Sequence, residues 1–126
     1  MKKLLLTFTF LIAILSVSAS HILGGEIYYD KLPGLNQYEF TVLIYRDPTG
    51  VALSNTANIS GSNGQLITAN LVPGTGPNYS VQVTCTESIE VYEYKGTATI
   101  TNVPSTGITF YWSSCCRPPG VDNIVN

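Results

Sequence analysis

The sequence predicts an all-β domain: a small antiparallel β-sandwich with Greek-key connections, of which the immunoglobulin-like arrangement is one form. Three observations lead to this fold class. Beyond residue 20, apolar and polar residues alternate with a period of two almost everywhere, and no stretch shows the amphipathic spacing of a helix. Proline and glycine separate the alternating runs at short intervals, which predicts about six strands joined by turns.

The first two strands are expected to form a hairpin. Residues 26–30 make a short first strand, and residues 38–45 make the most regularly alternating run in the chain. Residues 32–35 lie between them and hold a proline and a glycine, which favour a tight turn. One face of the second strand is expected to enter the core, because it carries large side chains: Tyr38, Phe40, Val42 and Ile44.

The middle of the chain gives both weak and strong strand signals. Residues 47–64 are poor in large apolar side chains and predict a long loop, with a weak edge strand at residues 57–59. Residues 65–72 predict a strand that ends at residues 73–77, where two prolines and two glycines occur. A half-buried strand is then expected, because four apolar residues alternate with polar ones: Tyr79, Val81, Val83 and Cys85.

Two further strands are expected before the chain ends. Residues 89–100 form the longer one, and Gly96 is expected to bend it or to create a bulge. Residues 108–115 form the other, which places three large apolar side chains on one face: Ile108, Phe110 and Trp112. Residues 118–126 offer no closing strand, so we expect this domain to be the N-terminal part of a longer protein.

The first 20 residues have the order of a secretory signal peptide. Lys2 and Lys3 give a positive start, an apolar run without charge extends from Leu4 to Val17, and small residues follow. The apolar run is shorter than the roughly 20 residues that a membrane-spanning helix needs. We therefore expect signal peptidase and the secretion machinery to act on the chain. Cleavage near residue 20 would leave a secreted or cell-surface β-sandwich of residues 21–126 without a membrane span.

The charge of the remaining chain excludes two classes of partner. Cleavage removes two of the six basic residues and leaves four against eight acidic residues, a net charge of about −4. Four positive charges cannot build the phosphate-neutralising face that nucleic acids require, and they do not favour anionic membranes. No motif predicts a cofactor or a metal ion, so the expected partners are proteins or surface glycans.

All three cysteines follow the leader. In an exported domain, cysteines are expected to form disulfides. Adjacent residues of a strand point to opposite faces, and Cys116 shares the face of Trp112. Because Cys85 is also expected to point inward, we favour a bridge between Cys85 and Cys116, with Cys115 as the alternative partner. Either bridge closes a loop of about thirty residues, worth roughly 3.5–4 kcal/mol in the chain-entropy model.

Three short segments of the chain occur together in one known family. Residues 20–26 are Ser-His-Ile-Leu-Gly-Gly-Glu, residues 43–47 are Leu-Ile-Tyr-Arg-Asp, and residues 115–118 are Cys-Cys-Arg-Pro. In combination they resemble an N-terminal module of large secreted and surface proteins of Bacteroidota, which often end in a gliding-motility-associated sorting domain for type IX secretion. The resemblance implies export, the cell surface, and adhesion or motility. The chain departs from the family at Pro48, where the family usually has cysteine, and a short form without the sorting domain would stay in the periplasm.

These observations predict a non-enzymatic β module that works by contact at the cell surface. Tyr92, Tyr94 and Glu90 alternate along one strand, and we expect them on one exposed face as a contact surface. Two other functions compete with this one. A glycan-binding extracellular domain would use exposed aromatic side chains, and the chain has eight tyrosines. A small secreted thiol enzyme would use His21, the only histidine, with one of the two adjacent cysteines.

Overall fold

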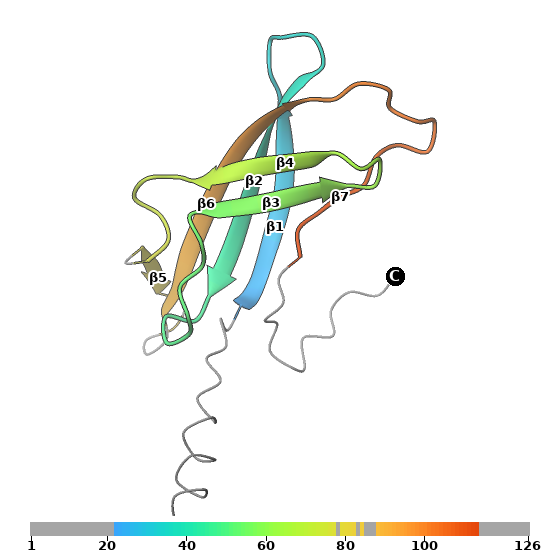
Figure 1. Ribbon diagram of the computed structural model, residues 1–126. Coiled ribbons are helices and arrows are strands. Elements are labelled where there is room, and N and C mark those ends of the chain that lie inside the picture. Colours follow the sequence, from blue (N-terminus) through green and yellow to red (C-terminus); the bar gives the residue numbers. More distant parts are fainter. Residues whose placement is uncertain (1–21, 78, 83, 85–87, 114–126) are drawn as a thin grey trace, which may run out of the picture.

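The computed structural model describes residues 22–77, 79–82, 84 and 88–113, which form antiparallel strands and their connections (Figure 1). The strands are β1 (Ile22–Lys31), β2 (Gln37–Arg46), β3 (Thr56–Gly61), β4 (Leu66–Leu71), β5 (Ser80–Gln82), β6 (Ser88–Thr99) and β7 (Phe110–Tyr111). The all-β prediction is confirmed, as is the hairpin of β1 and β2. Within these ranges there is no helix that is long and apolar enough to cross a membrane.

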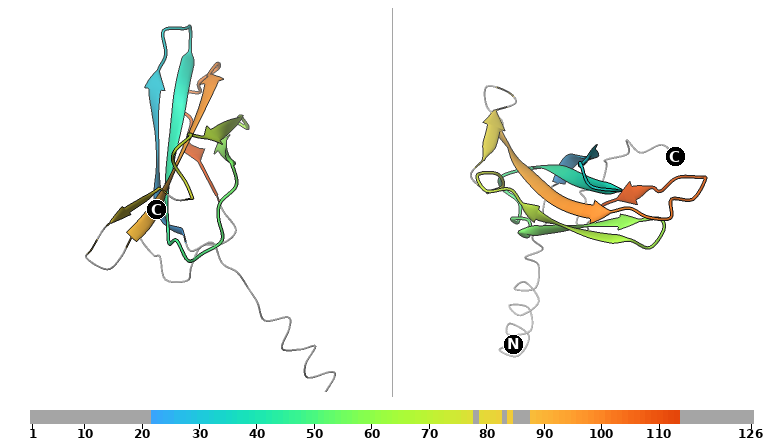
Figure 2. Two further views of the ribbon diagram at one scale, coloured as in Figure 1. Left: turned by 90° about the vertical axis from the view of Figure 1, so that its left-hand side faces the viewer. Right: turned by 90° about the horizontal axis from the view of Figure 1, so that it is seen from above.

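The strands form one sheet that folds over on itself (Figure 2). Their order is β1-β2-β6-β4-β3-β7, with β5 paired to β6. The long strands β1, β2 and β6 make one half, and β4 and β3 cross in front of it (Figure 1). Strand β7 pairs with β3 and belongs to this second half. The chain leaves β2 for β3, returns through β4 and then places β6 beside β2, which confirms the Greek-key connection. The halves stay joined through β4 and β6, whereas an immunoglobulin domain has two separate sheets.

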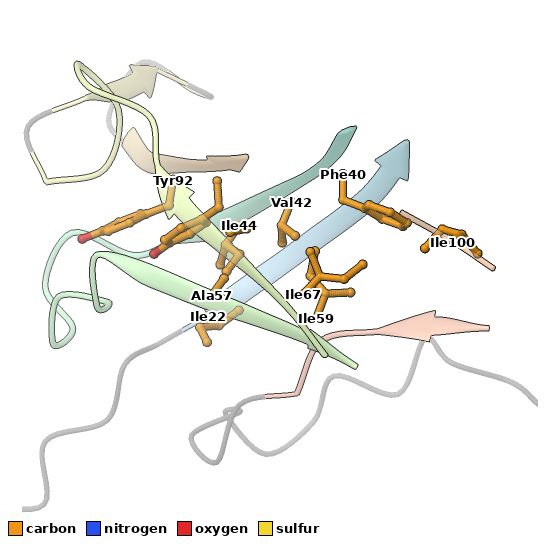
Figure 3. Close-up of a cluster of buried hydrophobic side chains, with 11 residues drawn as sticks. Ile22, Phe40, Val42, Ile44, Ala57, Ile59, Ile67, Tyr92 and Ile100 are labelled. Carbon is orange, nitrogen blue, oxygen red and sulfur yellow. The ribbon is translucent and has the colours of Figure 1, made fainter. Parts of the chain in front are cut away.

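The hydrophobic core lies between the two halves. Of the four β2 side chains predicted to enter it, Phe40, Val42 and Ile44 are almost completely buried, and Tyr38 packs at the margin. Side chains of β3 and β4 meet them from the other half (Figure 3): Ala57, Ile59, Ile67 and Ala69. Burial of each large side chain contributes about 1.5–3 kcal/mol, so this layer holds the two halves together.

Strand β6 curves around the core and belongs to both halves (Figure 2). Its pairing with β2 continues without interruption through Gly96, so the bulge that the sequence allowed there is absent. A Cβ atom at Gly96 would lie 2.7 Å from the carbonyl oxygen of Thr68 and 3.0 Å from the Cα of Ala69. Glycine is required at this position because β4 crosses β6 and approaches its backbone closely.

Strand β3 lies in the region predicted to be a long loop. It pairs with β4 on one side and with β7 on the other, so it is not a weak edge strand. Only small and medium side chains point inward from it, among them Ala57 and Ile59, and both are buried. The strand predicted at residues 57–59 is therefore present. Its edge position was wrong because the covering partners are remote in sequence, and they make a modest apolar content sufficient for a buried strand.

The strands on either side of β6 in the sequence are shorter than predicted. The prediction of a half-buried strand from residue 79 is wrong for the residues that the structure describes. Strand β5 has three residues, and all of them are exposed, including Val81. Strand β7 has only two residues. The shared face of Ile108, Phe110 and Trp112 is nevertheless confirmed, since all three pack against the core.

Candidate functional site

The contact surface predicted on β6 is wrong in its exposure. Tyr92 and Tyr94 do share a face with Glu90, but they are 0% and 1% exposed, and Glu90 is also buried. In the register of the sheet, Tyr92 lies opposite Ile44 and Tyr94 lies opposite Val42, so this is the core face. The two rings stack with centroids 6.2 Å apart. These three residues lie in the interior of the described fold.

A buried arginine explains why a glutamate is found on this inner face. Arg46, at the end of β2, lies opposite Glu90 and forms an ion pair with it through Nη1. The same nitrogen donates to the Tyr92 hydroxyl at 3.2 Å, and the guanidinium carbon lies 5.8 Å from the centre of that ring. Nη2 donates to the carbonyl oxygens of Pro48 and Gly50. Arg46 therefore anchors the loop after β2 to the core.

The second buried tyrosine fixes another part of the same connection. The Tyr94 hydroxyl donates to the carbonyl oxygen of Ser54 at 2.8 Å. Burial raises the pKa of Tyr94 to about 12, and the neighbouring Tyr92 adds to this shift. The phenol therefore stays neutral, and its role is that of a structural hydrogen-bond donor.

The opposite face of β1, β2 and β6 is partly exposed and is the candidate functional site; Thr41 at its centre is buried. Its side chains alternate with the core residues along each strand and are brought together by the register of the three strands. Tyr28, for example, is 43% exposed and lies on β1, opposite β2. We call this surface the outer face and define it by its charged and aromatic residues: Glu26, Tyr28, Asp30, Glu39, Tyr45, Glu93 and Lys95.

One hydrogen bond connects β1 and β2 across the outer face. The Tyr45 hydroxyl donates to Oε1 of Glu26 at 2.9 Å, although the two residues are 19 positions apart in the sequence. This hydrogen bond, partial burial and the charge of the carboxylate raise the pKa of Tyr45. The phenol thus holds the carboxylate of Glu26 in a fixed position at an exposed surface.

A lysine lies between two of the carboxylates of the outer face. Lys95 Nζ is 3.5 Å from Oε1 of Glu39 and 3.6 Å from Oε1 of Glu93. The pKa of Lys95 is raised chiefly by the charge of Glu39, with Glu93 adding to the effect and desolvation opposing it. The outer face has four carboxylates and this single ammonium group, so it carries an excess of negative charge.

The chemistry of the outer face suits the binding of a polar, uncharged or basic surface. Its tyrosines combine an apolar ring with a hydroxyl group, and its carboxylates accept hydrogen bonds. The excess negative charge repels nucleic acids and other polyanions. In the described part of the chain, no group of three or more His, Cys, Asp or Glu residues could hold a metal ion.

Several sequence predictions concern residues outside the described ranges. These are the signal peptide of residues 1–20, His21, and the cysteines at positions 85, 115 and 116. The disulfide between Cys85 and Cys116, or alternatively Cys115, stays a prediction. The thiol chemistry of the enzyme hypothesis stays a prediction for the same reason.

The sequence was compared with protein-family models, curated proteins and solved structures. No family model matches it, and neither a curated protein nor a solved structure matches it significantly. The resemblance to the surface proteins of Bacteroidota therefore stays a prediction. The function has to be argued from the outer face itself.

Sequence reasoning did not find the outer face as a unit. Alternation along β2 did show that Glu39 and Tyr45 share the face opposite the core side chains. It could not show that Glu26 and Lys95 lie beside them, because their positions depend on the register between β1, β2 and β6. Glu26 and Tyr28 alternate in the same way on β1 and were the available signal.

Proposed function

We propose that this chain is a non-enzymatic β module that is exported and works by contact through its outer face, at the cell surface or beyond it. Adhesion or motility is the process that the resemblance to surface proteins of Bacteroidota suggests. The leader-like first 20 residues support export. The expected partner is a protein or a glycan on a cell surface.

The observation that carries this proposal is the composition of the outer face. Tyr28 is exposed although it lies in the middle of a long strand, and Tyr45 is only partly covered. Neither ring belongs to the core cluster. A solvated sheet face is usually polar, and tyrosine is enriched where one protein surface meets another. The carboxylate of Glu26, held by Tyr45, adds a directed hydrogen-bond acceptor.

Export is tested by producing the complete chain, with a C-terminal tag, in a Gram-negative host. We expect the tagged product outside the cytoplasm, with an N-terminus near residue 20. A product that stays in the cytoplasm with its leader intact would contradict this part of the proposal.

Contact is tested with the chain lacking residues 1–20, by surface plasmon resonance on neutral polysaccharides, a basic protein and an acidic protein. Tyr28→Ala is expected to weaken binding by about tenfold or more, as expected for an aromatic side chain at the centre of an interface. Tyr111→Ala is the matched control, because Tyr111 is a half-exposed tyrosine of the other half. Equal effects of the two substitutions, or the lack of any binding, would contradict contact through the outer face.

A second candidate is the glycan-binding domain, which one observation favours. Tyr45 and Glu26 place a phenol ring beside an oriented carboxylate, and carboxylates accept hydrogen bonds from hydroxyl groups of neutral sugars. The two candidates differ in their response to salt. Binding of a basic protein to the carboxylates weakens as ionic strength rises, whereas binding of a neutral glycan does not.

A further inference from the structure

Strand β1 has a long free edge. Among the described residues, β2 is the only strand that pairs with β1, and Figure 2 (left) shows β1 on the side of β2 away from β6. Such an edge presents a row of unpaired N–H and C=O groups, here along ten residues. The strand at the other end of the sheet order, β7, has two residues. In the described part of the chain, β1 therefore offers a long unpaired edge to which another strand can be added.

The edge of β1 is poorly protected along most of its length. Natural edge strands are shielded by proline, by bulges or by charged side chains that point inward. From Gly25 to Asp30 the strand has no proline, and its register with β2 is regular; the irregularity lies at its first residues. The inward-facing residues Ile27 and Tyr29 lie opposite core residues of β2, yet they are 36% and 63% exposed. Apolar side chains on the core side thus remain open to solvent at this edge.

We propose that β1 pairs with β1 of a second copy of this chain, antiparallel and about a two-fold axis at Ile27. A two-fold contact uses the same surface on both copies and leaves neither edge open. It adds the β1–β2–β6 half of one copy to that of the other as a continuous sheet. The contact needs no rearrangement of the described strands, because the free side of β1 is the side that joins.

The charges of β1 select this register over its neighbours. With the axis at Glu26, the two copies of Glu26 would face each other, and with the axis at Tyr28, Glu26 would face Asp30 of the second copy. Like charges directly opposite each other destabilise a strand pair. With the axis at Ile27, Glu26 faces Tyr28 of the second copy and Asp30 faces Gly24. All like-charge pairs are avoided in this register.

The apolar side chains of β1 complement each other in the same register. Ile27 meets Ile27 of the second copy, and Tyr29 lies opposite Gly25. A Cβ atom at Gly25 would lie 2.8 Å from the carbonyl oxygen of Leu43, so close approach of β2 requires glycine here, and Gly25 has no side chain of its own to meet Tyr29 of the second copy. Aromatic side chains across from glycine stabilise such strand pairs. The pairing therefore covers two of the exposed side chains of β1, Ile27 and Tyr29.

The pairing would place two outer faces side by side on one sheet. A ligand with repeated units could then engage both copies, which raises avidity without any new contact. The pairing itself does not depend on what the outer face binds. A test that finds no pairing therefore does not contradict the proposed function, and a test that finds no binding does not contradict the pairing.

A cysteine scan tests the register in the chain lacking residues 1–20. Ile27→Cys is expected to give a disulfide between two copies, because opposite Cα atoms of an antiparallel pair lie about 4.5–5.5 Å apart, within disulfide range. Peptide mass mapping distinguishes this link from those of the native cysteines. Glu26→Cys and Tyr28→Cys are the controls. In this register residue 26 of one copy lies opposite residue 28 of the other, so two copies of the same introduced cysteine are not directly opposite each other. A link at residue 26 or 28 but not at residue 27 would overturn the register.

Light scattering tests the association without added cysteines. The chain is expected to be a dimer, and Ile27→Lys is expected to weaken dimerisation by about tenfold or more, because it places an inward-pointing charge at the edge. Val103→Lys is the matched control, as Val103 is an exposed apolar residue outside the strands. A monomer at the highest soluble concentration, or a dimer that Ile27→Lys leaves intact, would overturn the proposal.

Discussion

On each face of the β1–β2–β6 half, an ion pair connects β2 to β6. The two ion pairs differ in how far they are exposed to solvent. On the inner face, Arg46 pairs with Glu90, and their side chains are 3% and 12% exposed. On the outer face, Lys95 lies beside Glu39 and Glu93, and its side chain is 43% exposed. The same kind of charge pair is thus buried on one face and solvated on the other.

The difference shows how position in the sheet decides what a charge does. Removing two charges from water is costly, so the buried pair requires the added hydrogen bonds that Arg46 makes to Tyr92 and to two backbone carbonyls. The exposed pair is screened by solvent and contributes little to stability. Its groups remain accessible to a partner, as a binding surface requires. Stability should therefore respond to changes on the inner face, and binding to changes on the outer face.

The largest effect is expected from Arg46→Met. Removing one partner leaves the charge of Glu90 buried without compensation, which destabilises by about 3–5 kcal/mol. Urea denaturation followed by circular dichroism measures this loss. The double variant Arg46→Met/Glu90→Met is the control and should recover most of the stability, because no unpaired charge remains. A single variant as stable as the natural chain would remove the contrast between the two faces.

Gly96→Ala is expected to have the next largest effect. The added methyl group would meet backbone atoms of Thr68 and Ala69, and such overpacking costs about 1–3 kcal/mol. Gly24→Ala is the matched control, because the added methyl group would lie 3.8 Å from a side-chain carbon of Tyr45, an ordinary contact. The two substitutions should differ clearly in thermal unfolding. Equal midpoints would show that β4 and β6 can move apart at no cost.

A smaller effect, with a specific pH dependence, is expected from Tyr94→Phe. Loss of the hydrogen bond to Ser54 should cost about 0.5–1.5 kcal/mol. Because burial raises the pKa of Tyr94 to about 12, the folded state favours the neutral phenol. This contribution is present below pH 10, the ordinary pKa, and is lost as the pH rises through about 12.

The free energy of unfolding, measured across this alkaline range, tests the assignment. The natural chain should lose stability more steeply than Tyr94→Phe, while Tyr111→Phe, which changes an exposed ring, should follow the natural chain. Parallel curves for the natural chain and Tyr94→Phe would show that this phenol does not control the alkaline transition.

The smallest effect on stability is expected from Lys95→Gln. The neighbouring carboxylates raise the pKa of Lys95, so it is charged at neutral pH, but solvent screens its interactions. We expect an unfolding midpoint close to that of the natural chain, at low and at high salt alike. Binding through the outer face should respond instead, because the substitution makes that face more negative. A loss of stability as large as that of Arg46→Met would contradict the comparison.

Local alternation was sufficient to predict β2, but it could not decide which of two faces is covered. It placed Phe40 and Val42 inward correctly because their face is far more apolar than the other. It placed Tyr92 and Tyr94 on one face correctly, yet that face holds Glu90 and therefore resembled a solvated one. The missing information was the partner of Glu90.

That partner lies 44 residues away in the sequence, at the end of another strand. Alternation gives a period but no register, and the register alone places Arg46 opposite Glu90 and Tyr45 beside Glu26. Strand β5 shows the reverse error. Val81 alternates with polar residues as a half-buried strand would, but no described strand lies over it. Whether another strand covers a given face depends on the tertiary structure, so it cannot be predicted from the sequence of a single segment.

The position of β6 has a consequence for how this small domain comes apart. It pairs with β2, β4 and β5, and its tyrosines fill the space between the two halves. Local unfolding of either half must break its pairing with β6, and the other half depends on the same strand. We therefore expect the halves to melt together as one cooperative unit, whereas a strand that pairs on one side, such as β1, can fray on its own.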